Sequence, residues 1–167
     1  MADRFAALDS GVLLAIQANI PIYVEAHRLL KNAKFLFLAV PTVLQKLENI
    51  RRKHGTQRFT GACAQNILET PQTLDLILTT YSDIQRDVTE IHVQKLVHRN
   101  ILGDDHAIAL SPVLEAAYLD CVMFITDQQI ILENRNTLSL ALVDYCGMPK
   151  LYVCSPSEFV AYFGKVN

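Results

Sequence analysis

Five aspartates follow or interrupt apolar stretches of this chain, where a carboxylate needs a physical reason: Asp9, Asp104, Asp105, Asp120 and Asp127. A buried carboxylate without a partner costs several kcal/mol or shifts its pKa, so each one needs a partner, a metal or an exposed edge. Carboxylates that converge repel one another, and a hard divalent cation relieves that repulsion. Mg²⁺ or Mn²⁺ held in this way can activate a water molecule and neutralise a scissile phosphate. The aspartates therefore raise the hypothesis of a metal-dependent nuclease.

Each aspartate also has a simpler interpretation when it is taken alone. Asp104 or Asp105 could cap the N-terminus of a helix, and Asp127 could be a turn or cap residue. Only the joint placement of the aspartates supports a metal site, so the elements that position them decide the question.

Strands and helices are predicted to alternate along the chain. Four short apolar runs have the length and composition of buried strands: 4–8, 34–39, 121–126 and 150–153. Between these runs apolar residues recur at helical spacing, and Ser82 and Ser155 predict helix N-caps. Strands that alternate with helices indicate an α/β sandwich with a central parallel sheet.

This architecture predicts where the aspartates lie. Ligand sites in open parallel sheets form at the carboxyl ends of the strands. Asp9 ends the first predicted strand, Asp127 ends the third, and Asp105 opens a helix. All three can therefore reach one edge of the sheet, whereas Asp120 precedes its strand and belongs at the opposite edge.

The bulk properties limit the class of protein. The 167 residues contain 51% hydrophobic residues and no linker-like segment, so we expect a single domain over 1–167. With a net charge of -2, any polyanionic partner needs a local basic patch. The four cysteines are widely spaced and predicted to be reduced thiols. No signal peptide or membrane span is evident, so we expect a soluble, cytoplasmic protein without a membrane partner.

The chain resembles the PIN domain family, which includes the VapC type ribonuclease toxins. "LDSGVLL" at 8–14 resembles the opening "LDTNVLL" of that family, and "ILGDDHAIALS" at 101–111 resembles its "LLxxDAxIAA" motif. "FITDQQIIL" at 124–132 resembles "LVTxDxxF", and "VCSPSEFVAYF" at 153–163 resembles the usual ending "LTPEEFL". The four motifs occur in the family's order and span nearly the whole chain.

The resemblance implies a three-layer α/β/α sandwich with a central parallel sheet and a metal-dependent endoribonuclease that hydrolyses RNA. It implies a toxin of a type II toxin-antitoxin pair, with an antitoxin protein and a homodimer as expected partners. Asp9 takes the place of the first acid and Asp105 that of the third. The expected catalytic set is Asp9, Glu48, Asp105 and Asp127, with Mg²⁺ or Mn²⁺ held by Asp9, Asp105 and Asp127.

Three positions depart from the family pattern. Gly11 replaces the usual Asn of the first motif. In the last motif Gln128 holds the place of the usual acid, and Asp127 comes one residue early. Lys46 holds the place of the usual Glu after the second strand, and the nearest acid is Glu48. At about 100° per residue these two side chains point roughly 200° apart, so only one of them can face the site.

The strongest basic cluster follows on the same helix and includes Arg51, Arg52, Lys53 and, further on, Arg58. These cations could complement the C-terminal helix dipole, or they could contact RNA phosphates beside the acidic site. Both roles can hold together.

Two main hypotheses follow. In the first, the protein is a metal-dependent endoribonuclease. In the second, it is a PIN-like domain with a degraded active site that acts as an RNA-binding or protein-interaction module. A small-molecule-binding α/β domain of another lineage is a third hypothesis, but no Gly-rich phosphate loop supports it.

Overall fold

The computed structural model describes residues 4–80, 83–100 and 103–165, apart from the side chains of 83–84 and 104–108. Its elements are β1 (Arg4–Leu8), α1 (Ser10–Gln17), α2 (Pro21–Asn32), β2 (Phe35–Ala39), α3 (Pro41–His54), α4 (Phe59–Glu69), the 3₁₀ turn η1 (Pro71–Leu74), β3 (Leu76–Leu78), α5 (Asp83–His98), α6 (Asp104–Tyr118), β4 (Cys121–Ile125), α7 (Gln129–Cys146), β5 (Tyr152–Cys154) and α8 (Pro156–Phe163). Within this described part, no helix is long and apolar enough to cross a membrane.

The sheet is parallel throughout, with the strand order β3-β2-β1-β4-β5. The central strand β1 carries Ala6, Ala7 and Leu8, all buried, which suits a strand with helices on both faces. The predicted α/β sandwich with a parallel sheet is therefore confirmed. The four predicted strands correspond to β1, β2, β4 and β5, whereas β3 was not predicted because its "LIL" segment is only three residues long.

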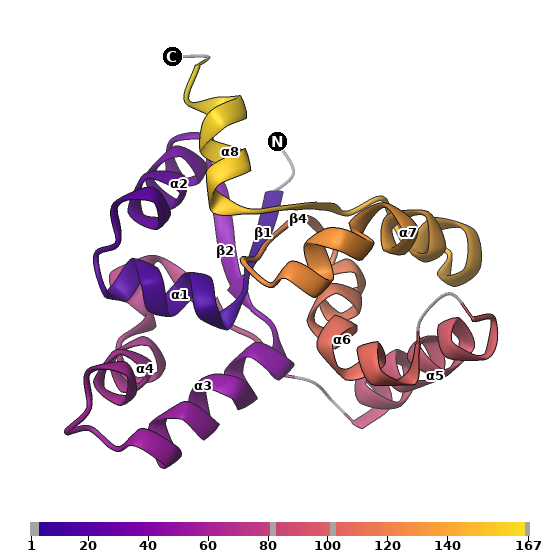
Figure 1. The fold of residues 1–167 in the computed structure, drawn as a ribbon, viewed down its shortest axis with the longest axis horizontal. Coiled ribbons are helices and arrows are strands. Elements are labelled where there is room, and N and C mark those ends of the chain that lie inside the picture. The colour runs from indigo at the N-terminus through magenta and orange to yellow at the C-terminus, as the bar shows by residue number, and fades with distance from the viewer. Residues whose placement is uncertain (1–3, 81–82, 101–102, 166–167) are drawn as a thin grey trace.

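Helices form a layer on each side of the sheet, as Figure 1 shows. Helices α1, α2 and α8 lie on one side, and α5, α6 and α7 lie on the other. On the first side the ring of His27 in α2 packs against that of Phe37 in β2, with ring centroids 4.5 Å apart. Helices α3 and α4 pack against each other near the carboxyl ends of the strands.

Local signals fix the starts of the helices that frame the site. The side chain of Asp9 caps α1, and Pro41 occupies the first turn of α3. Ser155 and Glu158 form the predicted capping box of α8. Ser82, the predicted cap of the helix that follows it, lies outside the described residues. Asp9 and Thr126 therefore stand together where β1 and β4 end, because the backbone NH of Asp9 donates to the carbonyl of Ile125.

Glycine shapes the turn between α3 and α4. Gly55 ends α3 with a φ of 62°, a left-handed value that favours glycine. Gly61, in the first turns of α4, faces this residue so closely that a Cβ there would lie 2.0 Å from the carbonyl oxygen of Gly55. The opposing atom belongs to the backbone, so it cannot move aside cheaply. The absence of a side chain at Gly61 lets the two helices approach.

We predict that Gly61→Ala lowers the free energy of unfolding by about 1–3 kcal/mol, because overpacking against backbone displaces α4. Urea denaturation measures this change. In an unconstrained helix the same substitution would stabilise by roughly 1 kcal/mol, so the sign of the effect is diagnostic. Thr60→Ala, at the exposed neighbouring position, serves as control and should stay within about 0.5 kcal/mol of the wild type. A stabilised Gly61→Ala variant would contradict the close approach.

Candidate functional site

The candidate site centres on Asp9, whose side chain is fully buried at the carboxyl edge of the sheet. Its Oδ1 accepts from the backbone NH of Ser10 at 2.7 Å and has a longer contact of 3.4 Å with the Ser10 hydroxyl. Its Oδ2 accepts from the Thr126 hydroxyl at 2.7 Å and from the Gln128 side-chain amide at 2.6 Å. A buried carboxylate is thus supplied with protein donors on both oxygens, as the cost of burying a charge requires.

Gln128 is the side chain that decides the character of this site. A carboxylate can only accept hydrogen bonds, so the amide of Gln128 must present its NH₂ group to Asp9. The backbone NH of Gln128 also donates to the Thr126 hydroxyl at 3.1 Å, which fixes the residue in place. A carboxylate offers about four lone-pair sites, and three donors lie within 2.7 Å of the Asp9 oxygens, while the Ser10 hydroxyl stands further off at 3.4 Å. As they stand, these residues do not fit a divalent cation at Asp9.

Asp127 lies on the rim of the same edge and faces Gly11. A Cβ at Gly11 would stand 2.7 Å from Oδ1 of Asp127 and 3.0 Å from Oδ2, so the missing side chain makes room for this carboxylate. The Tyr23 hydroxyl of α2 donates to Oδ2 at 3.2 Å. Burial raises the pKa of Tyr23, and the charge and hydrogen bond of Asp127 raise it further. Gly11, a departure from the family pattern, thus has a local steric role.

Glu115 is a buried acid that sequence reasoning missed. This residue of α6 is 5% exposed, and its carboxylate accepts from the backbone NH of Thr42 at 2.9 Å and from the Thr42 hydroxyl at 2.5 Å. It therefore caps the N-terminus of α3 from another helix. Burial raises its pKa, opposed by the Thr42 hydrogen bonds and the positive charge of Lys46. A lone Glu within the apolar "PVLEAAY" segment was the available signal.

The structure also places the two candidates for the second acid. Lys46 lies four residues after Thr42 on α3, and its positive charge favours the ionised form of Glu115 in α6. Glu48 instead binds Arg51 at 2.5 Å and Arg52 at 3.1 Å along its own helix. These arginines lower the pKa of Glu48. Among the described residues, no hydrogen bond joins Glu48 to Asp9.

Asp105 is the second residue of α6, as the predicted helix start requires, but its side chain lies outside the described part of the structure. At about 1.5 Å per residue, its backbone stands roughly 15 Å along the helix from Glu115. Among the residues whose side chains are described, no group of three or more His, Cys, Asp or Glu could hold a metal ion. The assignment of Asp105 as a metal ligand stays a prediction.

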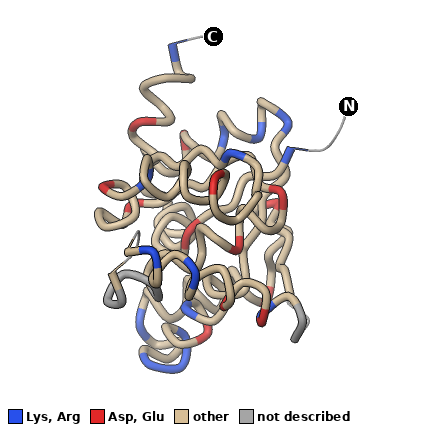
Figure 2. The backbone as a smooth tube through the Cα atoms, turned by 90° about the vertical axis from the view of Figure 1, so that its right-hand side faces the viewer, with Lys and Arg blue, Asp and Glu red and all other residues tan. Residues whose placement is uncertain are grey.

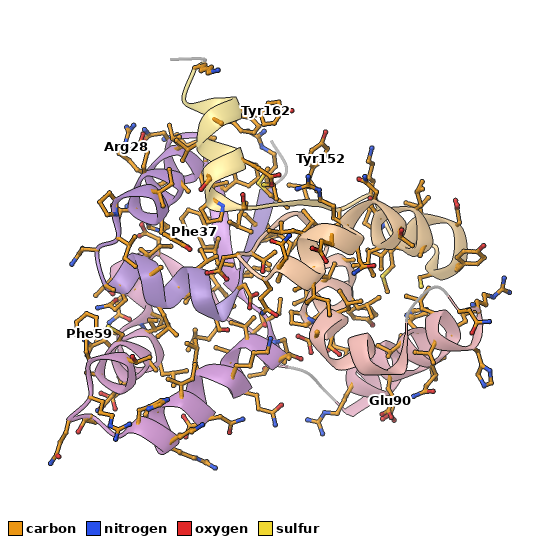
Figure 3. All side chains as sticks on the ribbon, in the orientation of Figure 1. Arg28, Phe37, Phe59, Glu90, Tyr152 and Tyr162 are labelled. Carbon is orange, nitrogen blue, oxygen red and sulfur yellow. The ribbon has the colours of Figure 1, made fainter. Side chains whose placement is uncertain are left out.

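The basic residues lie at the far end of α3 and in the turn that follows. Arg51 and Arg52 are engaged by Glu48, and Arg51 also approaches Glu69 at 3.9 Å. Lys53 and Arg58 are exposed, and the structure gives neither an ion pair among the described residues. Next to Arg58, the ring of Phe59 is 69% exposed at the start of α4 (Figure 3). We call Lys53, Arg58 and Phe59 the α3–α4 turn surface.

We predict that Gly11→Ala lowers the pKa of Tyr23, because the new methyl group displaces the Asp127 carboxylate from its hydroxyl. Burial still holds this pKa above its ordinary value. NMR titration of the Tyr23 ring measures it. Asp127→Ala should lower the pKa as well, and adding Gly11→Ala to that variant should change little more. A Tyr23 pKa that stays the same or rises in Gly11→Ala would contradict the predicted contact.

We predict that Glu115→Gln gains stability relative to the wild type as pH rises. The folded pKa of Glu115 is raised above its ordinary 4.5, so its contribution to stability is fully present below pH 4.5 and is lost as pH rises through the folded pKa. An amide retains a donor and an acceptor for Thr42 without titrating. Urea denaturation at pH 4.5 and 7.5 measures the difference. Glu90→Gln, at an exposed position labelled in Figure 3, is the control. A difference that is constant with pH would refute the prediction.

A scan against protein-family models finds no match for this chain, and a search of curated proteins finds no relative.

Proposed function

We propose that this protein is a PIN-like domain whose acidic site has lost its catalytic metal and that it acts as a binding module for RNA. The observation that carries the proposal is the hydrogen bond between the Gln128 amide and Asp9. It stands at the position where the resemblance places the last acid of a nuclease. An acid there would repel Asp9 unless a cation lay between them. The Gln128 amide instead donates a hydrogen bond to Asp9, so no cation is required.

A second substitution acts in the same direction on the other side of the site. Lys46 occupies the position where the resemblance places an acid, and its charge stabilises the ionised form of Glu115. A positive charge beside a carboxylate lowers the affinity of that region for a divalent cation. Glu48 could supply the missing acid only by giving up both Arg51 and Arg52. The charged groups of the site are thus paired with one another, and these pairs stabilise the fold.

The α3–α4 turn surface supports the RNA-binding part of the proposal. Lys53 and Arg58 can neutralise phosphates, and the exposed ring of Phe59 offers a face on which a base can stack. Gly61 lets α4 approach this turn closely, so Lys53, Arg58 and Phe59 stand on two helices that pack against each other. The expected antitoxin and homodimer stay predictions, and binding to RNA does not depend on either.

The test measures binding and cleavage of a fluorescein-labelled 12-nucleotide single-stranded RNA. We expect anisotropy to show binding in EDTA, and the RNA to remain intact after incubation with Mg²⁺ or Mn²⁺. Lys53→Glu combined with Arg58→Glu should weaken binding about tenfold or more and reduce the slope of log K against log[salt] by roughly 1.4, for two lost phosphate contacts.

The matched control reverses two exposed cations elsewhere, Lys95 and Arg99, which changes the net charge equally. It should bind RNA nearly as the wild type does. Cleavage that requires Mg²⁺ or Mn²⁺ and is lost in Asp9→Asn would overturn the proposal in favour of the endoribonuclease. No RNA binding by the wild type would refute the module itself.

A further inference from the structure

The opposite edge of the sheet, where the strands begin, carries exposed aromatic rings among basic residues. Tyr152, at the start of β5, is 63% exposed, and Tyr162, near the end of α8, is 78% exposed. Both side chains are labelled in Figure 3 at the end of the molecule where β1 begins and α8 ends. Single exposed apolar side chains are normal on protein surfaces, so these two rings carry weight only together with the charges at the same edge.

The register of the sheet puts the key residues on one face. Ala6 pairs with Phe37 of β2 and with Met123 of β4, and Met123 pairs with Tyr152. Side chains alternate along a strand, so Arg4, Phe35 and Tyr152 project on the face of Ala6 and Phe37. That face is the one covered by α2, because His27 packs on Phe37.

Tyr162 lies on the same face of the sheet, because its helix α8 packs against α2. The ring of Phe159 is buried and stacks on that of Phe163 at 4.6 Å, which anchors the last turn of α8. Tyr162, one residue earlier, projects outward instead. The two tyrosines therefore belong to elements, β5 and α8, that are packed into the fold.

One cation stands beside Tyr152 at this edge, and another stands beside Phe35. The ammonium of Lys150 lies 5.8 Å from the centre of the Tyr152 ring, and the guanidinium of Arg4 lies 5.2 Å from that of Phe35. Lys34 is exposed immediately before β2. Figure 2 shows lysine and arginine positions toward this end of the molecule. We call Arg4, Lys34, Lys150, Tyr152 and Tyr162 the amino-edge platform.

Two acids at the same edge offset part of this charge. Asp75 forms an ion pair with Lys31, and Asp120 precedes β4. Arg4, Lys34 and Lys150 outnumber Asp120, although the whole chain carries -2. A partner for this surface must therefore combine negative charge with flat apolar faces.

We infer that the amino-edge platform binds single-stranded RNA, with bases stacked on Tyr152 and Tyr162 and phosphates near Lys150, Lys34 and Arg4. Unpaired bases expose ring faces that a duplex hides, and aromatic rings beside cations are the usual means of holding such a strand. This inference rests on the proposed RNA-binding function but assigns it a second surface, at the edge opposite Asp9, and one RNA strand contacts this surface together with the α3–α4 turn surface. A polyacidic peptide would meet the charge but would leave the tyrosines without stacking partners.

The experiment measures the affinity of labelled U₁₂ RNA by fluorescence anisotropy. Each base stacked on an aromatic side chain contributes about 1–3 kcal/mol, so Tyr152→Ala and Tyr162→Ala should each weaken binding about tenfold. Tyr152→Phe and Tyr162→Phe retain the ring and should bind as the wild type does. Leu140→Ala, at a 65% exposed position on α7, controls for the loss of exposed apolar surface.

The possible results separate this inference from the proposed function. If the Lys53→Glu, Arg58→Glu variant loses affinity and both tyrosine-to-alanine variants keep it, the module binds RNA without the platform and the inference is wrong. If the wild type binds no RNA, both fail. Displacement of the RNA by decaglutamate at equal concentration would also overturn it, because charge alone would then explain binding. Loss in both alanine variants with retention in both phenylalanine variants establishes the platform.

Discussion

The site depends on the need to stabilise one buried carboxylate. Asp9 has no contact with solvent, and it stands where the first strand ends and the first helix begins. A charge in that position requires compensating donors, and the chain provides them from three places: the start of α1, the end of β4 and the residue before α7. These hydrogen bonds hold the two central strands and two helices in one arrangement. The same saturation leaves Asp9 few free lone pairs for an external ligand.

The neighbouring polar groups follow the same principle of internal compensation. Glu115 is held by Thr42 and by the charge of Lys46, and Glu48 is held by Arg51 and Arg52. Asp127 is accommodated because Gly11 has no side chain. A nuclease keeps its carboxylates in mutual repulsion until a cation arrives, whereas here each described acid of this region already has a protein partner. This difference is the physical reason for proposing binding in place of hydrolysis.

Much of the fold could be predicted from sequence, because buried parallel strands are continuous apolar runs and helices carry caps. β3 was missed because three residues give no periodicity. At the site, the positions of Asp9 and Asp127 followed from the rule that loops gather at the carboxyl edge. The apolar segment around Glu115 indicated a buried acid, but its partner Thr42, 73 residues earlier in the chain, could not be predicted. Nor could sequence decide between Lys46 and Glu48, since that choice depends on the arginines that hold Glu48. The tyrosines of the amino edge gave no signal, because exposure is a property of the packed fold.

In the proposed function, the Gln128 amide takes the place of a metal ion at Asp9. The most direct test of this proposal is a calorimetric titration of Mn²⁺ into the wild type and into Gln128→Asp, with the melting temperature of each followed in parallel. We expect no saturable binding by the wild type at millimolar Mn²⁺. We expect Gln128→Asp to be destabilised without metal and to gain both saturable binding and a melting temperature that rises with Mn²⁺ concentration. Saturable Mn²⁺ binding by the wild type that disappears in Asp9→Asn would show instead that Asp9 holds a metal beside Gln128.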